Sequence, residues 1–137
     1  MMLEMVMVPL FLGGSPWGPP RVIGAIALGE GMLPPPPPVD LTVVMVAMVI
    51  HFVLSVVFAA ALAWGLGRVS HGRALAVGAV FGLGLYAVNV YLLPSPGVFP
   101  WFAMARNGVS IGVHLAFGVL TAWFYGLWAG RRHPVAA

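Results

Sequence analysis

The sequence contains no cysteine, no lysine and very few charged residues of any kind. Without cysteine it has no disulfide, no thiolate metal ligand and no cysteine nucleophile. Only 7% of its 137 residues are charged and 61% are hydrophobic, whereas about a quarter of the residues of a soluble protein carry charge. The acids are Glu4, Glu30 and Asp40, and all six basic residues are arginine. The composition predicts an integral membrane protein with room for one domain.

The motifs of common enzymes are also absent. The sequence has no Ser-His-Asp set, no H-E-x-x-H, no Walker or Rossmann glycine pattern and no pair of carboxylates. No basic stripe or arginine–aromatic cluster is present that would bind the phosphates of a nucleic acid. We therefore expect a protein that is not an enzyme and that binds neither nucleic acid nor nucleotide.

Three long apolar segments predict membrane-spanning helices, at residues 41–64, 74–93 and 110–128. The first would extend roughly 36 Å at 1.5 Å per residue, enough to cross a hydrocarbon core of about 30 Å. Residues 1–12 would extend only about 18 Å, so we interpret them as an incomplete first span. The predicted fold is an all-α, integral membrane four-helix bundle that forms a single transmembrane domain over residues 1–137.

The segment between the first two spans predicts structure at the membrane surface. Residues 21–32 are expected to form a short interfacial helix, and the five prolines at 34–38 a stiff polyproline II spacer. Asp40 would then cap the next span, because a carboxylate accepts hydrogen bonds from the free N–H groups at a helix start.

The arginines predict the orientation of the chain. With four spans they divide into two groups: Arg68, Arg73, Arg131 and Arg132 on one side of the membrane, and Arg21 and Arg106 on the other. Cytoplasmic loops carry the excess of basic residues, so the side with more arginines is expected to be cytoplasmic. The prediction is a multi-pass protein of a bacterial inner (cytoplasmic) membrane with both termini in the cytoplasm.

The two halves of the chain share a weak similarity. Aligning His51 with His114 brings Arg68 onto Arg131, because each arginine follows its histidine by seventeen residues. The loops before the two histidines both contain L-x-x-S-P, a later proline and an arginine. This pattern predicts two tandem helix-loop-helix repeats in the same orientation, with the two histidines at equal depth.

Small residues four positions apart predict close packing of helices within the bundle, because they let two backbones approach in lipid. Three such spacings occur: Gly78-x-x-x-Gly82, Gly108-x-x-x-Gly112 and Gly126-x-x-x-Gly130.

Polar residues within the spans gather around the two histidines. Ser55 follows His51 by one helical turn, and Ser110 precedes His114 by one turn. The predicted polar cluster also includes Asn89, Tyr86 and Arg106. Because polar groups buried in lipid must satisfy one another's hydrogen bonds, the first hypothesis is that this cluster is structural.

Two further hypotheses give the histidines a function. In one, His51 and His114 are the axial ligands of a b-type haem, which needs facing imidazoles, small residues beside the macrocycle and cations near its propionates. Ala47, Gly112 and Gly118 would supply the room, and Arg106 or Arg21 the cation. In the other, the same histidines carry protons or ions through a small transporter or channel. No protein-bound metal site is predicted apart from this haem.

The runs "MLEMVMVPLFLGGSPWGPPR" and "LPPPPPVDLTVVMVAMVIHFVLS" resemble a family of small bacterial inner-membrane proteins, some of them labelled sodium:proline symporters. The resemblance covers about the first half of the chain and depends chiefly on G-G-S-P-W-G-P-P-R. Family members carry extra residues before Met-Leu-Glu-Met, which agrees with an incomplete first span. The resemblance implies no functional residues, and four spans do not supply the paired repeats of a full symporter.

Short loops, close glycine spacing and the absence of a catalytic set favour one function above the others. We predict a non-catalytic accessory, structural or assembly subunit of a larger membrane complex. Its partners would be membrane lipids and other integral membrane subunits.

Overall fold

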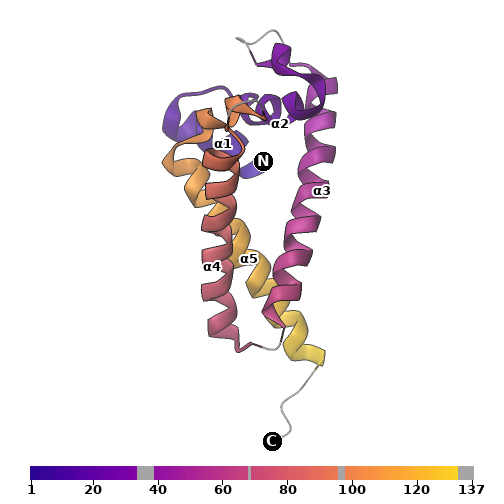
Figure 1. The fold of residues 1–137 in the computed structure, drawn as a ribbon, viewed down its shortest axis with the longest axis vertical. Coiled ribbons are helices and arrows are strands. Elements are labelled where there is room, and N and C mark those ends of the chain that lie inside the picture. The colour runs from indigo at the N-terminus through magenta and orange to yellow at the C-terminus, as the bar shows by residue number, and fades with distance from the viewer. Residues whose placement is uncertain (34–38, 68, 96–97, 133–137) are drawn as a thin grey trace, which may run out of the picture.

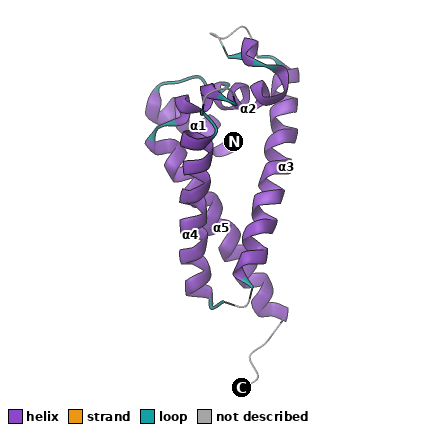
Figure 2. Ribbon diagram, viewed as in Figure 1, coloured by secondary structure: helices purple, strands orange, loops and turns teal. Residues whose placement is uncertain are grey.

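The computed structural model describes residues 1–33, 39–67, 69–95 and 98–132, with side chains up to residue 129. All regular elements in these ranges are helical, which confirms the all-α prediction (Figure 2). The proline run at 34–38, Arg68, and the side chains of Arg131 and Arg132 lie outside the described part, so the predicted spacer and orientation stay predictions.

Three helices are long and apolar enough to cross a membrane, as the sequence predicted. They are α3 (Leu41–Leu66), α4 (His71–Ala87) with its continuation η2 (Val88–Leu92), and α5 (Gly108–Arg132). In Figure 1, α3 and α4 run in opposite directions and lie apart over most of their length, and α5 begins beside α4 and crosses to the far end of α3.

The N-terminal residues form a shorter helix, α1 (Met2–Leu12), which ends where Gly13 adopts a left-handed conformation with φ of 64°. Figure 1 shows α1 and α2 at the end of the molecule away from the C-terminus, with the start of the chain between α3 and α4. The start of α1 therefore lies among the long helices, where Met1 is buried, whereas Leu10 and Phe11 near its end are exposed.

The short helix expected after the first span occupies different residues from those predicted. We expected a helix over 21–32, whereas α2 spans Gly18–Leu28 and a separate turn, η1, spans Glu30–Met32. The helix begins earlier because two prolines fill its first positions, where proline is favoured. It ends earlier because Gly29 has a φ of 87°.

Another short helix, η3 (Pro100–Ala105), contacts α2. Trp101 Nε1 donates a 3.0 Å hydrogen bond to the main-chain oxygen of Val22.

Helices α4 and α5 meet through glycine. A Cβ at Gly78 would overlap the main-chain oxygen of Gly118, and a Cβ at Gly82 would overlap the main-chain oxygen of His114. The predicted packing role of Gly78 and Gly82 is thus confirmed, because only glycine permits this approach.

The other two glycine spacings behave differently. Cβ atoms at Gly108 and Gly112 would meet nothing within 4 Å, and both residues are exposed. These two glycines line an open groove beside α1, so the close backbone approach predicted for this spacing is not present. At Gly126 a Cβ would lie 2.5 Å from the ring of His71, whereas Gly130 lies beyond the residues whose side chains are described.

Helix α3 is held at its two ends. Near its start, Val43 and Ala47 pack against Gly24 of α2, where a Cβ would lie 2.9 Å from a Val43 methyl group. Near its end, a second cluster is formed by Leu62, Leu66, Ala74 and Ala122 from α3, α4 and α5. No residue from position 48 to position 61 is buried. The middle of α3 therefore has little packing within the chain.

The start of α3 is capped as the sequence predicted. Asp40 Oδ1 accepts hydrogen bonds from the main-chain nitrogens of Thr42, at 2.8 Å, and Val43, at 3.3 Å. These bonds satisfy two of the four free N–H groups at the helix start.

The proposed repeat is not apparent in the packing. Helices α4 and α5 contact each other closely, whereas α1 contacts chiefly α5 and α2. The two hairpins are thus packed differently, and the tandem repeat stays a prediction.

Candidate functional site

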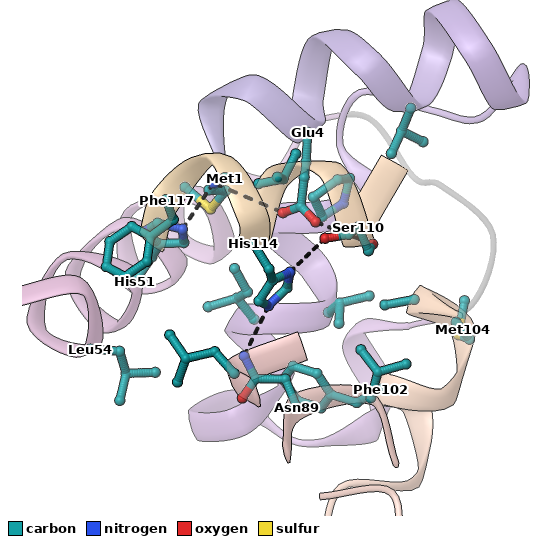
Figure 3. A pocket seen from close by; sticks show the side chains of 18 of the residues that line it. Met1, Glu4, His51, Leu54, Asn89, Phe102, Met104, Ser110, His114 and Phe117 are labelled. Carbon is teal, nitrogen blue, oxygen red and sulfur yellow. Dashed lines mark hydrogen bonds and ion pairs between the residues drawn. The ribbon is translucent and has the colours of Figure 1, made fainter. Parts of the chain in front are cut away.

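A cavity of about 380 Å³ lies between the helices, beside the first residues of the chain. Its walls come from α1, α2, α3, the end of α4 with η2, η3 and α5. Most of the lining is apolar, and the polar side chains belong to a small group that includes Glu4, His51, Asn89, Ser110 and His114 (Figure 3).

The cavity brings together most of the predicted cluster. His51, Ser55, Asn89, Ser110 and His114 all line it. The two histidines, which are far apart in the sequence, therefore face the same space, although their rings make no direct hydrogen bond to each other (Figure 3).

His114 has a partner on each ring nitrogen. Its Nδ1 lies 2.7 Å from the main-chain oxygen of Ser110, and its Nε2 lies 3.1 Å from Asn89 Nδ2. A carbonyl oxygen only accepts, so Nδ1 carries a hydrogen and donates it. Nε2 is then free to accept from the Asn89 amide. This arrangement describes a neutral imidazole with both nitrogens satisfied, which is the structural role expected for a polar group in lipid.

His51 also has two partners. Its Nδ1 lies 3.1 Å from Ser55 Oγ, as the one-turn spacing predicted, and its Nε2 lies 2.8 Å from the amino nitrogen of Met1. Since an ammonium group only donates, Nε2 is the acceptor in this contact.

Glu4 connects the two histidine sites, and the sequence did not identify it as part of the cluster. Ser110 Oγ donates to Glu4 Oε1 at 3.4 Å, and the Met1 amino nitrogen lies 3.9 Å from Glu4 Oε2. Ser110 is only 3% exposed. In the sequence, Glu4 is recognisable as an acid within an apolar helix. Its contact with Ser110 depends on the packing of α1 against α5, which the sequence did not predict.

Two predicted members of the cluster lie beside the cavity rather than in its lining. The ring of Tyr86 meets the ring of His114 edge to face, with 5.7 Å between the centroids. Tyr86 in turn contacts Tyr91, and the guanidinium of Arg106 lies 4.9 Å from the centre of the Tyr91 ring. Arg106 Nε also donates to the Val90 oxygen at 3.2 Å. These contacts support the wall that carries Asn89.

Asn89 lies in an unusual turn. Helix α4 continues into five residues of π-helix, Val88–Leu92, which places Asn89 opposite His114. Turns of π-helix are rare and occur frequently at functional sites. Sequence periodicity could not reveal it, because one widened turn leaves the apolar pattern almost unchanged.

The arrangement does not fit a haem held by the two histidines. The Nε2 atoms of both rings are occupied by Asn89 and by the Met1 nitrogen. The small residues expected to make room are elsewhere: Ala47 packs on α2, Gly118 packs on α4, and Gly112 is exposed. Neither Arg106 nor Arg21 is among the described residues that line the cavity.

Within the described ranges, no three His, Cys, Asp or Glu side chains lie close enough together to hold a metal ion. The resemblance of the first half of the chain to small inner-membrane proteins stays a prediction. None of the family models, curated proteins or solved structures compared with this chain matches it.

Proposed function

We propose that this chain is a non-catalytic accessory or assembly subunit of a larger bacterial membrane complex, in which a helix of a partner subunit packs against the middle of α3. The observation that carries the proposal is the absence of any buried residue between positions 48 and 61 of that helix. The cluster around the two histidines would then be structural, because its members hydrogen-bond to one another.

The exposed surface of the middle of α3 is apolar. The large exposed side chains on its outer face are Met48, Val49, Phe52, Val53, Val56 and Val57. Lipid tails are as apolar as these side chains, so association of helices in a membrane depends on shape and packing rather than on the hydrophobic effect. The methionine side chain of this surface is flexible and adapts to a partner, whereas its valine side chains are restricted at χ1 and are rigid.

The proposal includes an arrangement in the membrane. Residues 1–12 would form part of a first span, which with α3, α4 and α5 makes a four-helix bundle in the inner membrane. Both termini would face the cytoplasm, since the predicted excess of arginine lies on that side. The position of the N-terminus supports this arrangement, because the chain starts between α3 and α4 (Figure 1).

Site-specific crosslinking tests the proposal. A photoreactive amino acid replaces Phe52, which is 68% exposed, or Val80 of α4, which is 72% exposed and serves as the control. In native membranes we expect the probe at position 52 to give one discrete crosslinked protein that also copurifies, and the probe at position 80 to react mainly with lipid. A protein that purifies alone and shows no discrete crosslink at position 52 would contradict the proposal.

The same sample distinguishes the two other hypotheses. A haem protein would show a Soret band that disappears in His51→Ala or His114→Ala. A transporter or channel would give flux in liposomes that depends on those residues. The accessory function predicts neither signal.

A further inference from the structure

The hydrogen bonds of the cavity fix the orientation of the Asn89 amide. Because His114 Nδ1 donates to the Ser110 oxygen, Nε2 of the neutral ring is an acceptor, and the Asn89 nitrogen points toward it. A primary amide carries two hydrogens on its nitrogen, and His114 accepts only one of them. The second hydrogen of Asn89 and its side-chain oxygen have no partner among the described residues. Asn89 therefore leaves one donor and one acceptor in the lining of the cavity.

Most other polar side chains of the lining are engaged with one another. The Ser110 hydroxyl donates to Glu4, and the Ser55 hydroxyl shares a hydrogen bond with His51 Nδ1. The accepting atoms that remain, on Glu4 and His51, lie beside the first residues of the chain. Figure 3 shows Glu4 and Asn89 at opposite ends of the chain of hydrogen bonds. The free groups of Asn89 are therefore separate from those around the N-terminus.

Asn107 is the other amide in the lining, and it lies at the end of a span. Its oxygen accepts from the Ser110 nitrogen at 3.0 Å, so its free groups are the two amide hydrogens. It directly precedes the candidate span Gly108–Ala129, whereas Asn89 lies within the candidate span His71–Leu92. Water at the membrane surface can satisfy Asn107, but hydrocarbon offers no acceptor to Asn89. The second N–H of Asn89 is therefore the donor that requires a partner inside the cavity.

The walls of the cavity suit an uncharged aromatic molecule. Phe58 of α3, Phe102 of η3 and Phe117 of α5 contribute rings to them, and most of the remaining lining is aliphatic. Aromatic side chains pack edge to face or offset against other rings. The sequence contains no lysine, and no arginine is among the described residues of the lining, so an anion would have no cationic partner there. A volume of about 380 Å³ falls within the range of small-molecule pockets, which is about 300–1,000 Å³.

The π-helical turn is an independent sign that this wall of the cavity has a function. It spans Val88–Leu92, and it carries Asn89 to His114. A regular α-helix would serve a purely structural wall equally well, whereas widened turns are retained frequently at functional sites.

We propose that the cavity binds an uncharged aromatic carbonyl compound, the class that includes quinones and aromatic ketones, and that its carbonyl oxygen accepts the second N–H of Asn89. A carbonyl oxygen only accepts, and an orphaned N–H is rarer in proteins than an under-satisfied C=O, so a carbonyl complements this amide. His114 keeps its structural role, because it holds the Asn89 amide in place. The binding is separate from the accessory function, because it uses the inside of the bundle rather than the outer face of α3.

The test compares two matched probes on the protein in lipid nanodiscs. Benzophenone and diphenylmethane have nearly the same size, but only benzophenone has a carbonyl oxygen. Illuminated benzophenone reacts with C–H bonds beside its carbonyl, so mass spectrometry of the labelled protein measures its binding, and diphenylmethane competes with it. Nanodiscs that lack the protein give the correction for partition into lipid. We expect benzophenone to bind about two- to tenfold more tightly, which is the usual contribution of one uncharged hydrogen bond.

Two matched variants assign the preference to one amide. Asn89→Asp removes the second N–H, while a proton between the new carboxyl group and His114 preserves their contact, so the preference for benzophenone should disappear. Asn107→Asp makes the same chemical change at the start of α5 and keeps an oxygen that caps the Ser110 nitrogen, so the preference should stay. Circular dichroism shows whether both variants are folded.

The position of the label on the unaltered protein is a second measurement that needs no variant. We expect labelled residues in the lining of the cavity, such as Leu85 and Leu93, rather than only on exposed side chains such as Leu92, which is 63% exposed. Equal binding of the two probes, label confined to exposed side chains, or an unchanged preference in folded Asn89→Asp would overturn the proposal.

Discussion

Replacing Gly82 with alanine should separate α4 from α5 and destabilise the protein. The new Cβ would overlap the main-chain oxygen of His114 and would lie 3.1 Å from the Cα of Leu115. Neither atom can rotate away, because both belong to the backbone of α5. Overpacking of this kind costs about 1–3 kcal/mol, and the higher helix propensity of alanine returns up to about 1 kcal/mol. We expect a net loss of up to about 2 kcal/mol in the free energy of unfolding.

Gly84 supplies the matched control for this substitution. It lies on the same helix, and a Cβ there would meet nothing within 4 Å. Gly84→Ala should therefore stabilise the protein by up to about 1 kcal/mol through helix propensity alone. Reversible unfolding in mixed micelles, followed by circular dichroism, measures both variants. Equal stability of Gly82→Ala and Gly84→Ala would refute the close approach of α4 and α5.

Two other substitutions test the helix cap and the cavity wall. Asp40→Ala should destabilise α3 by about 1 kcal/mol because it removes the cap, whereas Asp40→Asn keeps an accepting oxygen and should be nearly neutral in the same unfolding assay. Asn89→Leu leaves His114 Nε2 without its donor and should cost about 1–3 kcal/mol. An unchanged ¹⁵N chemical shift of His114 Nε2 in this variant would show that Asn89 is not its partner.

The features that the sequence predicted correctly depend on local chemistry. The spans follow from length and hydropathy, and the Asp40 cap follows from the position of a carboxylate directly before a helix. The contact between Ser55 and His51 follows from the spacing of residues on one helix face. Each of these predictions needs only the neighbouring residues, so the sequence is sufficient for it.

The features that the sequence missed depend on which helix faces meet. Gly78 and Gly108 begin the same spacing, but the spacing does not say which of them faces a partner, and Gly108 is exposed. The haem hypothesis needed Gly118 to make room beside His114, whereas that glycine is used to pack α5 on α4. Periodicity identifies a face with small residues but does not identify its neighbour.

Glu4 shows why the histidines alone were an incomplete description of the site. The prediction from the sequence paired His51 with His114 and interpreted residues 1–12 as an incomplete span. In the structure these residues place a carboxylate between the two histidine sites, where the Ser110 hydroxyl donates to it and the Met1 nitrogen lies 3.9 Å away. A carboxylate in apolar surroundings needs hydrogen-bond donors, because an unpaired one is costly. The donation from Ser110 to Glu4 therefore helps to hold α1 against α5.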